Sequence, residues 1–87
     1  MKISDNYLVM IKDLELKNTM LRAAADIKHQ QIASNDVQLF LDNNKDKWYN
    51  LYTGKPFIWD ETSQEISFTG PLPKDFPDNR KLKLSLN

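Results

Sequence analysis

The sequence predicts an α+β fold, in which a long N-terminal helix packs on a small antiparallel sheet of two to three strands. The first observation is that residues 5–32 contain no glycine or proline and consist largely of good helix formers. The second is that residues 65–69 and 81–86 alternate apolar and polar side chains, the period of a half-buried strand. At 87 residues, the chain is expected to form one small domain spanning residues 1–87.

The helical half is expected to span residues 5–43. Within it, Asp13 and Lys17 have the i,i+4 spacing of a favourable charge pair. Two alternatives stay open near residue 34: the helix continues to about Asn43, or it breaks at Ser34, a candidate N-cap, and restarts. The polar residues that follow predict a solvated loop before the β half.

The apolar residues of this helix form two stripes on opposite sides. At about 100° per residue, one stripe consists of Tyr7, Ile11, Leu14, Leu21, Ala25 and Ile32. The opposite stripe consists of Val9, Leu16, Met20, Ala23 and Ile27.

A surface helix of a monomer needs only one apolar face, so two stripes indicate burial on two sides. One interpretation is that the second side contacts another protein chain, most simply a second copy in a homo-oligomer. The candidate interaction residues are then Tyr7, Ile11, Leu14 and Leu21. The alternative is that the C-terminal half wraps around a central helix.

The β half, residues 48–87, begins with a predicted hairpin. Phe57 and Trp59 belong to its first strand and Phe68 to its return strand, and all three are expected in the core. Gly54 is expected to supply a positive φ in the turn before the hairpin.

A proline-rich connection and a third strand complete the β half. Residues 71–80 contain three prolines and predict an irregular segment. In residues 81–86, Leu82, Leu84 and Leu86 are expected to point inward, and the intervening lysines suit an edge strand.

The composition excludes several kinds of function. Twelve basic and twelve acidic residues give zero net charge, which argues against a nucleic-acid partner. The chain has no cysteine, and its single histidine, His29, has no residue spacing that completes a catalytic or zinc site. We therefore expect no enzyme activity, no cofactor and no metal. Asp75, Asp78 and Asn79 offer oxygen ligands on one loop, and whether they bind calcium or only face solvent stays open.

One short motif resembles a known family. In "LYTGKPFIW", Gly54, Pro56, Phe57 and Trp59 follow a long helix, and this arrangement resembles the soluble region of bacterial type IV pilins and type II secretion pseudopilins. Leu51 and Tyr52 stand where that family often has Asp-Pro. The resemblance implies an extracytoplasmic module, tethered to the membrane through a longer protein, that functions by assembly.

The alternative function is that of a small cytoplasmic dimerising or regulatory protein. Under either reading this segment is not expected to insert into a membrane, because it has no run of about 18 apolar residues. The partner is expected to be a protein in both cases.

Overall fold

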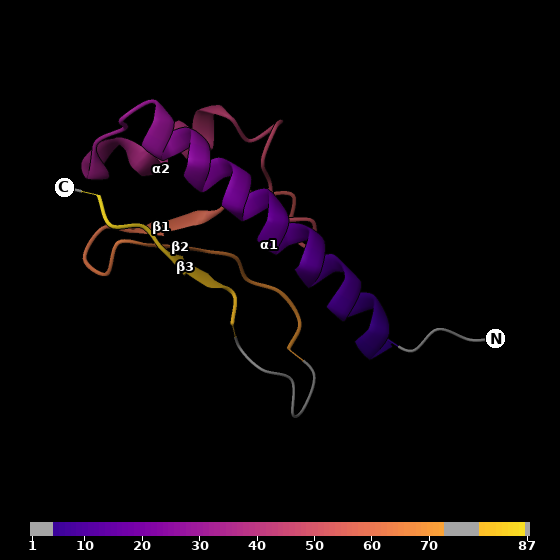
Figure 1. Ribbon diagram of the computed structural model, residues 1–87. Coiled ribbons are helices and arrows are strands. Elements are labelled where there is room, and N and C mark those ends of the chain that lie inside the picture. Colours follow the sequence, from indigo (N-terminus) through magenta and orange to yellow (C-terminus); the bar gives the residue numbers. More distant parts are fainter. Residues whose placement is uncertain (1–4, 73–78, 87) are drawn as a thin grey trace.

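The computed structural model describes residues 5–72 and 79–86, and it confirms the α+β prediction. A long helix lies over a three-stranded antiparallel sheet, with a second short helix between them in the sequence (Figure 1). The elements in chain order are α1 (Asp5–His29), the 3-10 turn η1 (Ser34–Asp36), α2 (Val37–Asn43), β1 (Ile58–Asp60), β2 (Glu65–Ser67) and β3 (Lys81–Lys83).

The helical half is broken, which decides between the two alternatives left open by the sequence. Gln31 has a φ of 55°, in the left-handed region. Its N–H donates to the carbonyl of Lys28 (3.2 Å), and the N–H of Ile32 donates to that of Ile27 (3.0 Å). This is the hydrogen-bond pattern of a Schellman motif, which satisfies the last carbonyls of a helix. The chain then continues through η1 into α2, which contacts β1.

The sheet has the order β1-β2-β3 with β2 in the centre. Ile66 pairs with Trp59 on one side and with Leu82 on the other, and this row faces the helices. On the solvent face, Glu65 pairs with Lys83, which places opposite charges side by side. The predicted hairpin, with one face on the helix, is thus confirmed.

The core lies between α1, α2 and the inner face of the sheet. Phe57, Trp59 and Phe68 are all buried, as predicted. The core cluster includes one whole stripe of α1, and its members on that helix are Leu16, Met20, Ala23, Ala24 and Ile27.

The third strand is shorter than predicted. β3 ends at Lys83: Leu84 still donates its N–H to the carbonyl of Gln64 (2.8 Å), the residue opposite it in the register, but the N–H of Leu86 donates to the Gln64 side-chain oxygen (2.9 Å) instead of to a backbone carbonyl. Leu84 is buried, and Leu82 and Leu86 are half-buried, in agreement with their predicted inward orientation.

The N-terminal turns of α1 extend beyond the strands (Figure 1). The molecule measures 47 × 25 × 18 Å along its principal axes. A helix of 25 residues is about 37 Å long, so α1 accounts for most of the longest dimension, and a short sheet cannot cover all of it.

Candidate interaction surface

The exposed stripe of α1 consists of the residues that the sequence analysis singled out. Tyr7, Ile11, Leu14 and Leu21 expose 49%, 42%, 57% and 54% of their surface. By helical geometry they lie opposite the buried stripe of Leu16, Met20, Ala23 and Ile27. The structure therefore brings the four predicted residues together on the outer side of α1.

Four further exposed residues lie within or beside this stripe. Leu8 and Met10 are exposed on its flanks near the N-terminal end of α1. Asn18 and Ala25 are also exposed, and they fill the gaps between the larger side chains. We call the set Tyr7, Ile11, Leu14, Asn18, Leu21 and Ala25 the outer stripe.

The outer stripe is held outward by a buried ion pair on the other side of α1. The Asp13 carboxylate accepts hydrogen bonds from Nε of Arg80 (2.8 Å) and from one terminal guanidinium nitrogen (3.1 Å). Only 2% of Asp13 and 4% of Arg80 is exposed. Because both charges are out of water, this contact fixes the rotation of α1 against the segment that leads into β3.

Tyr52 completes this cluster. Its hydroxyl donates to Asp13 (2.5 Å) and lies 3.0 Å from the carbonyl of Val9. Burial alone would raise the pKa of Asp13, but the hydrogen bonds from Arg80 and Tyr52 and the charge of Arg80 outweigh it and hold that pKa below its usual 3.8. Burial and the bond to Asp13 raise the pKa of Tyr52 to about 12. The cluster is therefore a carboxylate with two donors, and both protonation states are fixed at neutral pH.

Sequence reasoning missed this cluster and assigned Asp13 only to an i,i+4 charge pair with Lys17. In the structure Asp13 is buried and forms its hydrogen-bonded ion pair with Arg80, while the charge of Lys17 makes a smaller contribution to the lowered pKa of Asp13. A signal was present: Asp13 lies four residues after Val9 and three before Leu16, so it occupies a position within the apolar stripe. Nothing in the sequence identified Arg80 as its partner.

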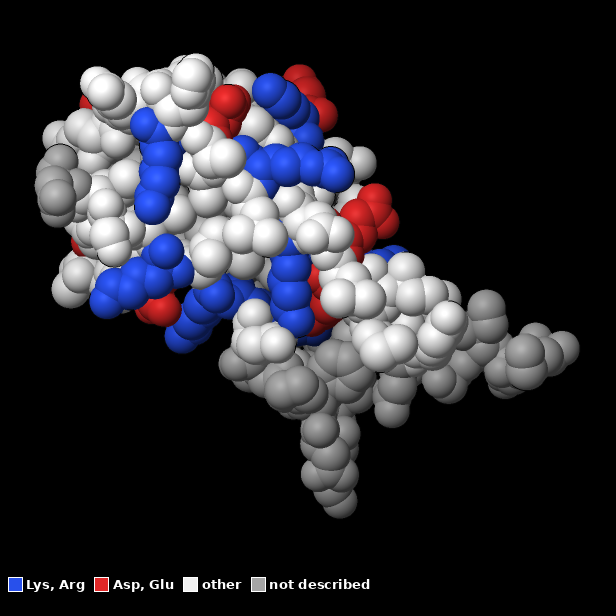
Figure 2. All heavy atoms as spheres, in the orientation of Figure 1, with Lys and Arg blue, Asp and Glu red and all other residues white. Residues whose placement is uncertain are grey.

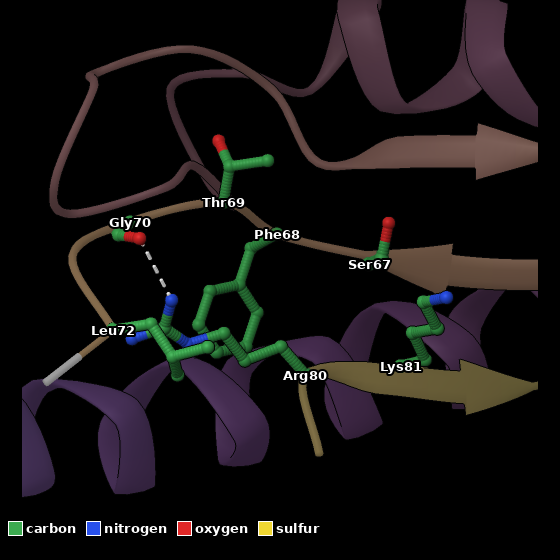
Figure 3. A pocket seen from close by; sticks show the side chains of 7 residues that line it. All are labelled: Ser67, Phe68, Thr69, Gly70, Leu72, Arg80 and Lys81. Carbon is green, nitrogen blue, oxygen red and sulfur yellow. Dashed lines mark hydrogen bonds between the residues drawn. The ribbon is translucent and has the colours of Figure 1, made fainter. Parts of the chain in front are cut away.

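A hollow of about 260 Å³ lies beside Arg80, between the end of β2 and the start of β3. Figure 3 shows the Arg80 side chain passing the Phe68 ring toward Gly70. Its guanidinium donates to the carbonyls of Gly70 (2.9 Å) and Pro71 (2.5 Å). The donors of Arg80 that line the hollow thus bind the protein's own backbone, so we assign the hollow a structural role.

A separate groove of about 520 Å³ lies over Gln38 and the segment before β1. Gln38 uses both ends of its side-chain amide there. Its oxygen accepts from the N–H of Trp59 (2.7 Å), and its nitrogen donates to the carbonyl of Phe57 (3.0 Å). This amide occupies the outer edge of β1 as a neighbouring strand would.

The remaining candidate groups form no site among the described residues. His29 is exposed at the end of α1. Of the loop residues considered for calcium, Asp75 and Asp78 lie outside the described residues, and Asn79 is exposed. Within residues 5–72 and 79–86, no group of three or more histidine or acidic side chains is close enough to hold a metal ion.

The charged surface is mixed in sign. Figure 2 shows lysine and arginine side chains spread over the body of the molecule with acidic ones among them, whereas uncharged side chains cover the visible N-terminal part of α1. In the part of the chain that is described, no helix has both the length and the apolar character needed to cross a bilayer. Comparisons with models of protein families, with curated protein sequences and with solved structures find no match.

Proposed function

We propose that this protein is a non-catalytic assembly module that associates with a second copy of itself through the outer stripe of α1. The observation that carries the proposal is the exposure of Ile11, Leu14 and Leu21 on one side of a helix whose other side is fully packed. Contiguous exposed apolar side chains on a soluble domain favour a protein contact.

The two sheet edges are less suited to assembly. The free edge of β1 is occupied by the Gln38 amide, which bonds both Trp59 and Phe57. The free edge of β3 presents Lys81 and Lys83, and charged side chains disfavour the addition of another strand. The helix surface is therefore the better candidate for an interface.

The pilin-like module and the cytoplasmic dimerising protein both require this association step. The residues that carry the pilin resemblance have structural roles here: Gly54 has a φ of 72° in a turn, and Phe57 and Trp59 are buried. The pilin resemblance and the compartment stay predictions.

Sedimentation equilibrium of the wild type and of Ile11→Asp/Leu14→Asp tests the proposal. The wild type should associate in the micromolar range, and the variant should be monomeric, because it loses two apolar side chains of the contact and buries a carboxylate without a partner at position 14. The matched control is Leu39→Asp/Leu51→Asp, which adds the same charge at two exposed apolar residues outside the outer stripe. A wild type that remains monomeric at hundreds of micromolar would refute self-association.

A further inference from the structure

We infer that two copies pair through α1 in an antiparallel orientation, with Glu15 of each copy against Arg22 of the other. The inference rests on the proposed self-association and specifies its geometry. In this register Leu14 faces Ala25 of the second copy, and Asn18 faces Leu21. It follows from three observations: the spacing of the outer stripe, the charges on its flanks, and the side from which the domain body contacts α1.

The outer stripe has the spacing of a coiled-coil seam. Its members follow one another at steps of four, three, four, three and four residues, from Tyr7 to Ala25. Apolar residues at this spacing let two helices pack side by side. The buried residues Leu16 and Ala23 lie at the heptad position farthest from the seam, so the domain body packs mainly on the opposite side of α1.

The charges flanking the seam distinguish the orientations. Glu15 and Arg22 lie on one flank and are exposed, and neither forms an ion pair among the described residues. In an antiparallel pair the same flank of each copy meets its counterpart. Glu15 therefore faces Arg22 of the second copy, and this contact occurs twice per dimer. In a parallel pair opposite flanks meet, and Lys17 would face Arg22 of the second copy, a repulsive contact.

The same charges select the register. An antiparallel pair displaced by one heptad in one direction would place Glu15 against Glu15 of the second copy, and Lys17 against its own counterpart; displaced in the other direction, it would place Arg22 against Arg22. Like charges held opposite each other across two helices are destabilising. The proposed register has none of these contacts.

The domain body covers part of one flank of the seam and leaves the other flank open. On the Lys17 flank, Ala24 is buried in the core and Lys17 is half-buried. On the other flank, Glu15 and Arg22 are open to solvent. The side chains that would form the intermolecular ion pairs are therefore free of the body that carries them.

Charge reversal tests the inference by sedimentation equilibrium at low salt. In the proposed dimer, Arg22→Glu should weaken association about tenfold, because two attractive contacts become repulsive. Glu15→Arg/Arg22→Glu should restore it, because the pair is exchanged. A mixture of Glu15→Arg and Arg22→Glu should form heterodimers more tightly than either variant forms homodimers. Lys45→Glu, which makes the same charge change on an exposed loop, should have no effect.

Each other arrangement gives a different result. A parallel dimer would be strengthened by Arg22→Glu, because the introduced carboxylate would then face Lys17 of the second copy. A displaced antiparallel register would leave association unchanged by Arg22→Glu. Either outcome would overturn the inferred geometry while leaving self-association intact, whereas a monomeric wild type would overturn both. Circular dichroism establishes that each variant is folded.

Discussion

Asp13 and Arg80 lie 67 residues apart in the sequence and form a buried ion pair with Nε–Oδ2 at 2.8 Å. Asp13 is in the N-terminal half of α1, and Arg80 immediately precedes β3. Together with Tyr52, the pair joins the N-terminal half of α1 to the segment that leads into β3. Its position on the inner side of α1 leaves the outer stripe free to contact another molecule.

Replacing one partner of this pair should strongly destabilise the protein. Asp13→Ala is expected to lower the free energy of unfolding by about 3–5 kcal/mol, because it leaves the Arg80 charge buried without its counter-ion. Asp13→Ala/Arg80→Leu should cost less than the sum of the two single changes. Urea unfolding followed by tryptophan fluorescence measures all four proteins. Additive losses would show that the two residues do not act as a unit.

Acid should destabilise the protein through Asp13. Its folded-state pKa lies below 3.8, so its contribution to stability is fully present above the unfolded-state pKa and is lost as the pH falls through the folded-state value. The free energy of unfolding of the wild type should therefore decrease between about pH 4 and pH 2. The curve for Asp13→Asn should be flatter there, and an equal slope in both proteins would contradict this assignment.

Alkaline pH should destabilise the protein through Tyr52. Its pKa is raised to about 12, so its contribution is fully present below its ordinary value of 10.0 and is lost as the pH rises toward 12. Ultraviolet absorbance at the phenolate band should show one tyrosine that titrates late, and Tyr52→Phe should remove that step. The prediction is wrong if the late step survives in the variant.

Replacing either Gly54 or Gly70 should lower the stability of the protein, but for different reasons. A Cβ at Gly70 would collide with the Tyr52 ring, and overpacking of this kind costs about 1–3 kcal/mol. A Cβ at Gly54 meets no neighbour, but the φ of 72° costs other residues about 1–2 kcal/mol. Asparagine tolerates this region, so Gly54→Asn should be milder than Gly54→Ala, whereas Gly70→Asn should be no milder than Gly70→Ala. Thermal melting ranks the four variants.

Trp59 is expected to be a main contributor to the core. It exposes 8% of its surface, and its indole N–H donates to the carbonyl of Ser34 (2.9 Å). Trp59→Ala should cost about 3–5 kcal/mol, the range for removing a large buried aromatic side chain. Trp59→Phe keeps most of the apolar contact and should cost less. A melting temperature near that of the wild type in Trp59→Ala would show that the ring is not part of the core.

The local pattern of the sequence determined the elements and their apolar faces. The spacing of Leu14 and Leu21 against Leu16 and Ile27 established that α1 has two apolar sides, because side-chain direction in a helix depends only on position along it. Alternation in residues 65–69 and 81–86 likewise established which side chains of β2 and β3 point inward.

Only the tertiary structure decided which side of α1 is covered and how the helical half ends. Both stripes are apolar, and the covered one is the stripe that packs in the core and carries Asp13, which contacts Arg80 across 67 residues; no local pattern encodes these contacts. The end of α1 depends on Gln31 adopting a left-handed φ, a conformation that glycine signals and glutamine does not. The interaction residues could therefore be predicted as a set, but their exposure required the packing of the whole chain.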